Sequence, residues 1–407
     1  MLERNFDKLF TSVSLARKNT IHYSKNLLHL PKIDSMKLFC NIPLLDKEDI
    51  RKDYKLFLAK GRIEKDLDIT YTSGSTGVPI KYIRSRRETI DLGMSLAMER
   101  KKWINANLPY TIAHFFKTVR PITYKYSKRQ KSSMILSLYD HTPERLNLFI
   151  SALSEFKPTI LQGYSSTLYE IAKYIKDNNV KLPEIKLIEN RSEHLSEKQR
   201  NFIENTFDTK VSNMYGMAEH YPIAYSCRLG NMHICEGNAF VEIISSNTNN
   251  PVGDGETGEI VITSLISETM PLIRYKTGDI GKISTNNCEC GDTRAILELS
   301  YGRTNNYIKT PHGNINSSVI RRLFRYMYDD ELNWINQSQI IQEDYYTFKV
   351  NLVPNKWPLN NVNVIERKVE EIVKSSLPYN VKIKIEWVSK LEKNPVSKKV
   401  SEFISKC

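Results

Sequence analysis

Residues 71–81 read YTSGSTGVPIK and follow the apolar residue Ile69. Positions 72–77 hold only hydroxyl residues and glycines, so this loop offers backbone N–H and side-chain O–H donors without bulky side chains. Such a loop can wrap around phosphate oxygens. It is not a Walker A loop, because no Lys-Ser or Lys-Thr pair follows its second glycine. On composition alone, a phosphate-binding loop and an ordinary polar turn are equally acceptable interpretations.

The segments after this loop alternate between strands and helices. Short apolar runs at 157–161, 185–188 and 211–214 are typical of buried strands, and amphipathic helices separate them. One of these helices begins at Ser196, where Gln199 three residues on completes a capping box. This alternation predicts an α/β fold with a parallel sheet and helices on its faces.

The pattern changes in the second half of the chain. Residues 241–244 and 259–263 alternate between apolar and polar positions, which predicts an antiparallel or barrel-like portion. The last hundred residues mix helix and strand patterns, after a polar stretch at 302–306 that is typical of a linker. We therefore predict a large N-terminal domain over residues 1–303 and a small α+β domain over residues 304–407.

Length and composition indicate a globular chain. The 407 residues are 40% hydrophobic and 26% charged, enough for two or three domains. No apolar run approaches the roughly 18 residues of a membrane span, and the start MLERNFDKLF is charged, unlike a signal peptide. We expect neither membrane insertion nor secretion. Six cysteines are too few for a disulfide framework, so a reducing cytoplasm is the expected location.

The charge balance favours polyanionic partners. Lysine and arginine outnumber aspartate and glutamate by 59 to 46, a net charge of +13. Such a surplus suits a nucleotide, coenzyme A, an acidic carrier protein, nucleic acid or an anionic membrane, and a simply solvated surface is the alternative. No block of more than three basic residues and no aromatic RNA-binding signature is present, so nucleic acid is disfavoured.

Further motifs follow the loop in a recognisable order. They are LQGYSSTLYEIA (161–172), RSEHLS (191–196), YGMAEH (215–220), TGEIVITSL to MPLIRYKTGD (257–279), GRTNNYIKTPHGNI (302–315) and NPVSKKV (394–400). With the loop, this order resembles the adenylate-forming enzymes, in the branch of phenylacetate–CoA ligase, CapK-like and coenzyme F390 synthetase-like proteins. The resemblance covers almost the whole chain and is weakest over residues 1–60.

The resemblance implies ATP-dependent activation of a carboxylic acid as acyl-AMP, with release of pyrophosphate. The acyl group then passes to an acceptor, with the coenzyme A thiol as the leading candidate and a carrier protein or an amine as alternatives. Adenylyl transfer of the coenzyme F390 synthetase type is another enzyme class to weigh. A degenerate homologue that only binds nucleotide is disfavoured, because Glu219, Asp279 and Lys399 are all present.

The same resemblance implies a role for each motif residue. The implied nucleotide-binding residues are Thr72, Ser73, Gly74, Ser75, Thr76 and Gly77 at the β- and γ-phosphates, Ser192, Glu193 and His194 at the adenine, Tyr215, Gly216 and Met217 between adenine and acid, and Asp279 and Arg303 at the ribose. Glu219 is implied to help hold Mg²⁺. Taken singly, Glu219 could instead be a surface carboxylate and Asp279 a turn former.

Lys399 is the implied catalytic cation and Lys398 the less favoured candidate, because the chain departs from the family there. The family usually ends with Ser-Gly-Lys, whereas this chain has Ser397-Lys398-Lys399. The family also rotates its C-terminal domain about a hinge after Gly-Arg, which corresponds to residues 304–306. In phenylacetate–CoA ligases the segment beyond ends in an aromatic residue and a proline. Its loss here weakens the case for coenzyme A.

Four cysteines lie between positions 227 and 290. Cys227, His233, Cys288 and Cys290 make a Cys₃His set suited to tetrahedral zinc, with Cys235 as a competitor for His233 and reduced buried thiols as the alternative. Similar pairs form a structural zinc site in phenylacetate–CoA ligase-like proteins, which implies structural Zn²⁺ here.

The acid itself is not readable from the sequence. Candidates for an aromatic-accepting pocket are His114, Phe115, Phe116, Tyr164, Met214 and Met217, although aromatic residues at such places are more often core.

Overall fold

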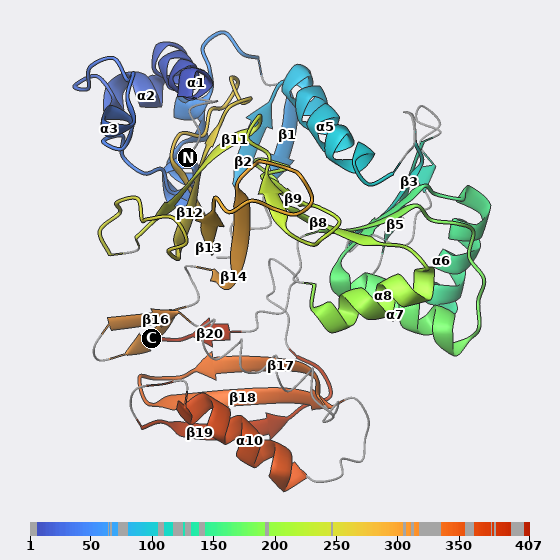
Figure 1. Cartoon of the computed structure of the whole chain (residues 1–407). Coiled ribbons are helices and arrows are strands. Elements are labelled where there is room, and N and C mark those ends of the chain that lie inside the picture. Colours follow the sequence, from blue (N-terminus) through green and yellow to red (C-terminus); the bar gives the residue numbers. More distant parts are fainter. Residues whose placement is uncertain are drawn as a thin grey trace.

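The computed structural model describes residues 6–63, 65, 67–71, 80–104, 110–116, 125–126, 132–137, 143–191, 195–245, 247–303, 307–310, 313–316, 335–354, 362–375, 377, 380–391 and 403–407. A twelve-stranded sheet runs through the larger part of the molecule (Figure 1). From edge to edge its strands are β11 (Ala239–Ile244), β12 (Gly258–Ser264), β13 (Tyr275–Ser284), β14 (Ile296–Arg303), β10 (Met232–Ile234), β9 (Ala224–Ser226), β8 (Val211–Tyr215), β7 (Leu187–Arg191), β6 (Ile160–Gly163), β3 (Ile112–Phe116), β5 (Ser133–Ser137) and β4 (Lys125–Tyr126).

One half of this sheet is parallel, as the alternation of strands and helices predicts. Strands β8, β7, β6, β3 and β5 run in the same direction. The predicted strand at 157–161 begins later, at Ile160, because Lys157 adopts a φ of 50° and ends the preceding helix. The predicted helix start at Ser196 is confirmed, with the reciprocal Ser196–Gln199 capping box.

Helices cover both faces of the parallel half. Helices α6 (Pro143–Phe156), α7 (Ser165–Asp177) and α8 (Glu197–Phe207) pack against residues such as Leu161 and Ile188. Helix α5 (Arg86–Lys101) packs on the other face, against Ile160 and Leu187. Successive side chains on a strand point to opposite faces, so these two clusters are separated by the sheet.

The antiparallel half corrects the prediction of a barrel-like part. Strand β9 pairs antiparallel with β8 through Met214 and Tyr225, and β10 to β14 continue from there. These strands therefore extend the parallel half sideways instead of closing on themselves. No closed barrel is present in the described ranges.

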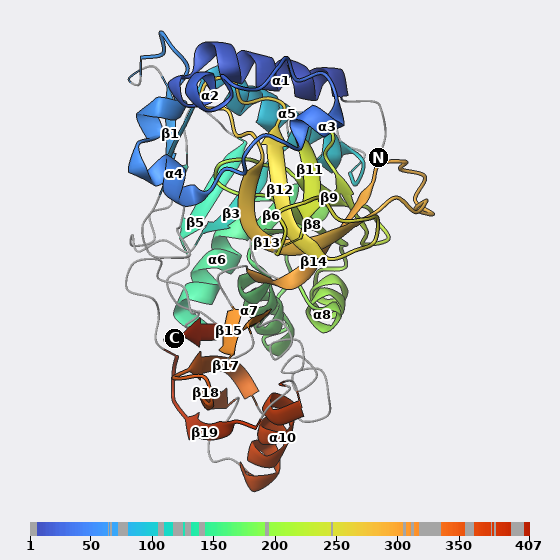
Figure 2. The same ribbon diagram turned by 90° about the vertical axis from the view of Figure 1, so that its left-hand side faces the viewer.

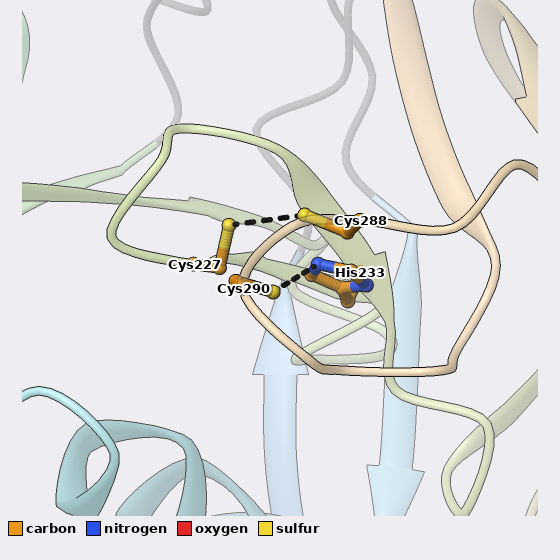
Figure 3. Close-up of side chains that lie close together, drawn as sticks. All are labelled: Cys227, His233, Cys288 and Cys290. Carbon is orange, nitrogen blue, oxygen red and sulfur yellow. Dashed lines mark hydrogen bonds between the residues drawn. The ribbon is translucent and has the colours of Figure 1, made fainter.

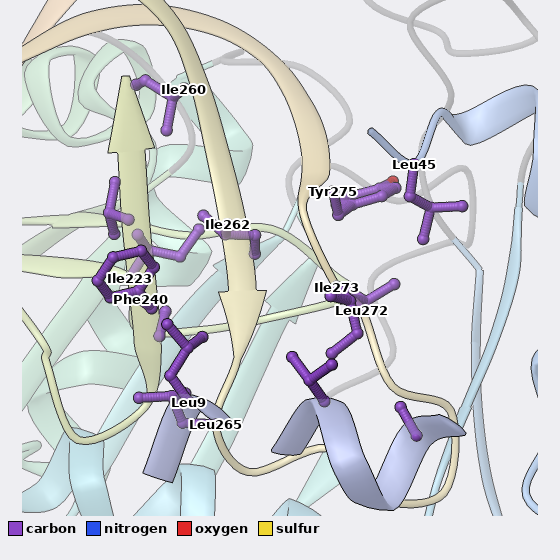
Figure 4. Close-up of a cluster of buried hydrophobic side chains, with 14 of the residues drawn as sticks. Leu9, Leu45, Ile223, Phe240, Ile260, Ile262, Leu265, Leu272, Ile273 and Tyr275 are labelled. Carbon is purple, nitrogen blue, oxygen red and sulfur yellow. The ribbon is translucent and has the colours of Figure 1, made fainter. Parts of the chain in front are cut away.

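Four short helices of the N-terminal segment cover the antiparallel half (Figure 2). They are α1 (Phe6–Asn19), α2 (Ile21–Asn26), α3 (Met36–Phe39) and α4 (Lys47–Lys52), followed by the 3₁₀ turn η2 (Tyr54–Phe57). Leu9 of α1 lies in one buried cluster with Phe240, Ile262 and Leu265 (Figure 4). None of the helices in the described part of the chain is both long and apolar enough to cross a membrane.

A smaller sheet forms the C-terminal part. Its strands, in order, are β19 (Lys382–Trp387), β18 (Thr347–Pro354), β17 (Ile335–Gln342) and β20 (Phe403–Ser405), with helix α10 (Val362–Ser375) packed on it. The hairpin of β15 (Tyr307–Thr310) and β16 (Gly313–Asn316) precedes this sheet. Gln342 joins the two, because its amide accepts from Lys309 N–H at 2.9 Å and donates to Lys309 C=O at 2.6 Å. The boundary at 303/304 stays a prediction.

Candidate active site

The predicted phosphate loop connects two paired strands. Strand β1 (Asp68–Tyr71) runs antiparallel to β2 (Lys81–Arg84), with Tyr71 opposite Lys81. Residues 72–77 themselves lie outside the described residues. The Lys81 ammonium lies 3.0 Å from the Tyr54 hydroxyl and 4.5 Å from the centre of that ring. Strand pairing therefore holds the two ends of the predicted loop together.

Two of the predicted nucleotide-binding residues meet at the end of strand β8. The Tyr215 hydroxyl donates a hydrogen bond of 3.0 Å to the Asp279 carboxylate on β13. Gly278 before Asp279 has a φ of 77°, a left-handed conformation that favours glycine. The backbone of Arg303 on β14 is paired with Asp279, and its side chain is outside the described atoms. The structure thus brings together Tyr215, implied to lie between adenine and acid, and Asp279, implied to contact the ribose.

Gly216 and Met217 form a tight turn directly after Tyr215. Met217 N–H donates to the His220 carbonyl at 2.8 Å. A Cβ atom on Gly216 would lie 2.9 Å from the Tyr221 Cβ, closer than side chains normally approach. The turn therefore requires glycine at position 216 for steric reasons.

Glu219 is buried, so its interpretation as a surface carboxylate is wrong. The residue is 2% exposed, and its Oε1 accepts a hydrogen bond of 2.8 Å from the Tyr275 hydroxyl. The Lys47 ammonium lies 4.0 Å from the same oxygen. Burial, and then the Glu219 charge, raise the pKa of Tyr275 well above its usual range, so this hydroxyl remains a donor at physiological pH.

Lys47 and Arg84 are the site residues that the sequence analysis misses. Lys47 begins helix α4, where Asp46 and Asp49 form a capping box. Arg84 on β2 donates to the carbonyls of Ala218 and Glu219 at 2.7 and 2.9 Å, which fixes the backbone that carries the Glu219 carboxylate. Neither residue belongs to a local motif, so only the fold reveals them.

His220 beside them is a buried histidine that stays neutral. Burial, reinforced by the Arg84 guanidinium, lowers the pKa of His220 to about 3. This imidazole therefore carries no charge at physiological pH.

The predicted Cys₃His set comes together around one point (Figure 3). The ligand atoms of Cys227, His233, Cys288 and Cys290 all lie within 4.8 Å of one another. The two sulfur atoms of Cys227 and Cys288 are 3.9 Å apart, close to the separation of about 3.8 Å that a tetrahedral zinc with 2.3 Å Zn–S bonds requires. His233 Nε2 lies 3.3 Å from the Cys290 sulfur. The donor set and its spacing fit zinc.

Neighbouring groups orient these ligands. His233 Nδ1 lies 3.0 Å from the Arg294 carbonyl, which accepts its proton and leaves Nε2 as the ligand atom. The backbone N–H of Cys290, assisted by the Asn231 amide, lowers the pKa of the Cys288 thiol to about 6. Arg294 also pairs with Asp292 and with Glu99 on α5 at 2.7 Å each. The cysteine loop is thereby tied to helix α5.

Cys235 does not belong to this group. It is buried against α5, and burial raises the pKa of its thiol to about 12. The competition between Cys235 and His233 that the sequence leaves open is therefore resolved in favour of His233. All six cysteines are free thiols.

The structure divides the candidates for an aromatic-accepting pocket. Phe115 packs edge-on against Phe149, with ring centres 5.4 Å apart, and belongs to the core under α6–α8. His114 projects to the opposite face, where its Nδ1 lies 2.5 Å from Gln162 Oε1. The remaining candidates are spread out: Met214 is buried against α5, Met217 borders the cluster under α1, Tyr164 precedes α7, and the Phe116 side chain is outside the described atoms.

Several predicted residues lie outside the described residues. They are Ser192, Glu193 and His194 of the implied adenine segment, Lys398 and Lys399 near the end, and residues 304–306 of the implied hinge.

The large α/β sheet brings Tyr215 at the end of β8 into contact with Asp279 on β13, and Glu219 lies in the turn after β8. With a small α+β unit after it, this arrangement is typical of the adenylate-forming class. The chain belongs to the AMP-binding enzyme family, whose sequence model matches residues 64–266. The CapK C-terminal domain matches residues 308–405. The resemblance noted in the motifs is thereby confirmed.

Individual relatives are distant. Protein CapK of Staphylococcus aureus is 26% identical over 403 residues, covering 94% of this chain and 84% of that protein. Phenylacetate-coenzyme A ligase of Thermus thermophilus is 27% identical over 166 residues, covering 39% of this chain and 37% of that enzyme.

Solved structures share the fold. 2-Hydroxyisobutyryl-CoA ligase in its postadenylation state matches with a TM-score of 0.73 and 15% identity over 98% of this chain and 88% of that one. The amide bond synthetase of Marinactinospora thermotolerans matches with a TM-score of 0.58 and 14% identity, over 85% of this chain and 70% of that one.

Proposed function

We propose that this protein activates a carboxylic acid with ATP and transfers the acyl group to an acceptor. A carboxylate oxygen attacks the α-phosphorus, the bond to the bridging oxygen breaks, and pyrophosphate leaves, giving acyl-AMP. The acceptor then attacks the acyl carbon and AMP leaves. The observation that carries the proposal is the convergence of Tyr215–Asp279 and Tyr275–Glu219–Lys47 after strand β8.

The residues around Glu219 suit the metal that such a reaction uses. Glu219 is a buried carboxylate oriented by the Tyr275 hydroxyl, and the Lys47 ammonium lies 4.0 Å from it. Carboxylate oxygen is a preferred ligand of Mg²⁺. When bound, Mg²⁺ would neutralise charge on the phosphate oxygens. Lys47 supplies a second positive charge on the same side of the carboxylate.

The other side of the site suits the nucleoside. Asp279 accepts a hydrogen bond from Tyr215, and a carboxylate has about four lone-pair positions, enough to accept from ribose hydroxyls as well. The residues at 72–77 would hold the β- and γ-phosphates, Ser192, Glu193 and His194 would border the adenine, and Arg303 would reach the ribose. Lys399 would meet the α-phosphate as charge develops there.

Coenzyme A is the leading acceptor in this proposal. The structural neighbours include a CoA ligase and an amide bond synthetase, which supports a thiol or an amine as acceptor. A carrier-protein thiol is a third option. We propose a cytoplasmic location, because all six thiols are free.

The test is ATP–pyrophosphate exchange with Mg²⁺ and a broad panel of aryl and aliphatic acids. We expect exchange that depends on the acid, and a product whose mass equals acid plus acceptor minus water. AMP attached stably to a hydroxyl compound, without exchange by any acid, would favour adenylyl transfer of the coenzyme F390 synthetase type and contradict the proposal.

We also propose that Cys227, His233, Cys288 and Cys290 hold one structural Zn²⁺. All four coordination positions would be filled by protein, so the ion would stabilise the fold and leave no position open for substrate. It would join the turn after β9 to the loop between β13 and β14.

The zinc proposal predicts about one zinc per chain in protein purified without chelator. Cys288→Ser should lose most of the metal and lower the melting temperature by on the order of 5–10 °C. Cys407→Ser, at an exposed thiol outside the cluster, is the matched control and should change neither quantity. Absence of zinc from the unsubstituted protein would end this idea.

A further inference from the structure

A row of polar side chains crosses the parallel half of the sheet on the face covered by α5. His114 on β3 is in register with Gln162 on β6, Gln162 with Glu189 on β7, and Glu189 with Ser212 on β8. Residues in register project to the same face, so the four side chains form one continuous line. On this face the strands begin with apolar residues and become polar toward their carboxyl ends. That change in polarity is unusual for a buried sheet surface.

The negative charge of Glu189, at the centre of this row, is neutralised by an ion pair with Arg100. Its carboxylate is completely buried and accepts two hydrogen bonds of 2.8 Å from Arg100 on α5 and one of 2.8 Å from the Tyr225 hydroxyl. Gln162 also donates to it. Burial acts to raise the pKa of Glu189, but the Arg100 guanidinium outweighs burial and holds the pKa at about 2. One negative and one positive charge therefore cancel.

Arg191, two residues further on the same strand face, brings a second guanidinium. Its Nη1 donates to Gln162 Oε1 at 2.9 Å, and this is the one hydrogen bond that the Arg191 side chain makes to the described residues. No carboxylate of its own lies within salt-bridge distance in the described ranges. Burial lowers the pKa of His114 to about 4, so His114 is neutral. Among the described residues, the row is left with one excess positive charge and with four N–H donors of a partly buried arginine that make no hydrogen bond.

Arg191 lies at the carboxyl end of strand β7, close to the residues implied to bind the acyl-adenylate. Arg191 is the last residue of strand β7 and is paired with Met214, the residue that precedes Tyr215 on β8. Open α/β sheets bind ligands at these carboxyl ends of their strands. From there the polar row runs over β7, β6 and β3, away from Asp279 on β13. The Tyr221 ring lies 5.7 Å from the Arg191 guanidinium and 5.6 Å from that of Arg84, which holds the backbone of Glu219. Arg191 thus directly precedes the implied adenine segment 192–194, and its side chain lies on the α5 face of the sheet, in line with the polar row.

We propose that Arg191 selects acids that carry a second anionic group, with dicarboxylic acids as the substrate class. This inference rests on the proposed acid activation. Arg191 shares its nearest described carboxylate, Glu189, with Arg100, which is ion-paired to it. Partial burial of the second guanidinium is therefore costly, and a substrate carboxylate would supply a counter-ion. Arginine presents parallel N–H donors that match a carboxylate in two-point contact. The Gln162 amide nitrogen donates to Glu189, which orients the amide oxygen toward Arg191. This oxygen accepts from the Arg191 guanidinium and so holds it in place.

The experiment compares matched acids in ATP–pyrophosphate exchange. The two members of each pair have the same number of carbon atoms, and a carboxylate in one replaces a methyl group in the other: butanoate and succinate, hexanoate and adipate, 4-methylbenzoate and terephthalate. We expect the unsubstituted protein to prefer the diacid of at least one pair by roughly 30-fold or more in kcat/KM, the range of a partly buried charge pair. Arg191→Gln should reduce that ratio to near one, and Arg191→Lys should give an intermediate ratio.

Arg200→Gln is the matched control, because it removes a guanidinium from α8 on the other face of the sheet and should leave the ratio unchanged. A preference of the unsubstituted protein for the monoacids would overturn the inference, whatever the folding of the variants. So would an equal loss for both members of each pair in Arg191→Gln, or a change confined to the KM of ATP. Those results would assign Arg191 to the reacting carboxylate or to the nucleotide. Absence of exchange with every acid would instead count against acid activation itself.

Discussion

Lys399→Ala should lower acid-dependent ATP–pyrophosphate exchange by on the order of 10²–10³-fold, the loss typical of a single well-placed group that stabilises developing charge. Negative charge accumulates on the α-phosphate oxygens as the acid attacks, and the Lys399 ammonium is the cation expected there. The second half-reaction should be nearly unaffected if the C-terminal part has then rotated away. It can be measured separately, as AMP release from chemically supplied acyl-adenylate and acceptor.

Lys398→Ala is the matched control for this experiment. It removes the same charge from the adjacent position of the same segment, Ser397-Lys398-Lys399. We expect exchange close to that of the unsubstituted protein. An equal loss in both lysine variants would mean that net charge in this segment matters more than one positioned ammonium. An equal loss in both half-reactions of Lys399→Ala would mean that the residue has a structural role.

Glu219→Gln should be nearly as damaging to exchange, again by on the order of 10²-fold or more, because it removes the charge that holds Mg²⁺. The amide oxygen can still accept from the Tyr275 hydroxyl, so the fold around it should persist. The Mg²⁺ concentration for half-maximal exchange should rise strongly while the melting temperature stays close to that of the unsubstituted protein.

The matched control for Glu219 is Glu298→Gln on strand β14. Glu298 pairs with Lys282 on the surface, where an ion pair contributes little. We expect neither exchange nor its Mg²⁺ dependence to change. Unaltered Mg²⁺ dependence in Glu219→Gln would show that this carboxylate only orders the site through Tyr275.

The parallel half of the fold could be predicted because its signals are local. Apolar runs such as 185–188 and the Ser196–Gln199 capping box are complete within a few residues. The course of the antiparallel half could not be predicted in the same way. Whether β9 closes a barrel or extends the existing sheet depends on its pairing with β8, and no local pattern records that pairing.

The candidate site likewise combines residues found in local motifs with residues that only long-range packing brings together. Tyr215, Glu219 and Asp279 stand in motifs, and the Cys₃His set follows from spacing, so the sequence finds them. Lys47 lies far from Glu219 in the chain, and only packing of the N-terminal helices brings it there. His114 and Phe115 are neighbours on a strand, so they face opposite sides of the sheet and cannot line one pocket together.

The continuity of the twelve-stranded sheet has a consequence for how acid preference can change. Asp279 and the polar row at His114 and Gln162 stand on strands of one hydrogen-bonded ladder, whose neighbours are about 4.8 Å apart. If Asp279 holds the ribose and Arg191 the second carboxylate, as proposed, the sheet fixes the distance between them, and this distance does not depend on any rotation after residue 303. Acceptance of a longer or shorter acid then requires replacing side chains along β3, β6 and β7, one step of the ladder at a time.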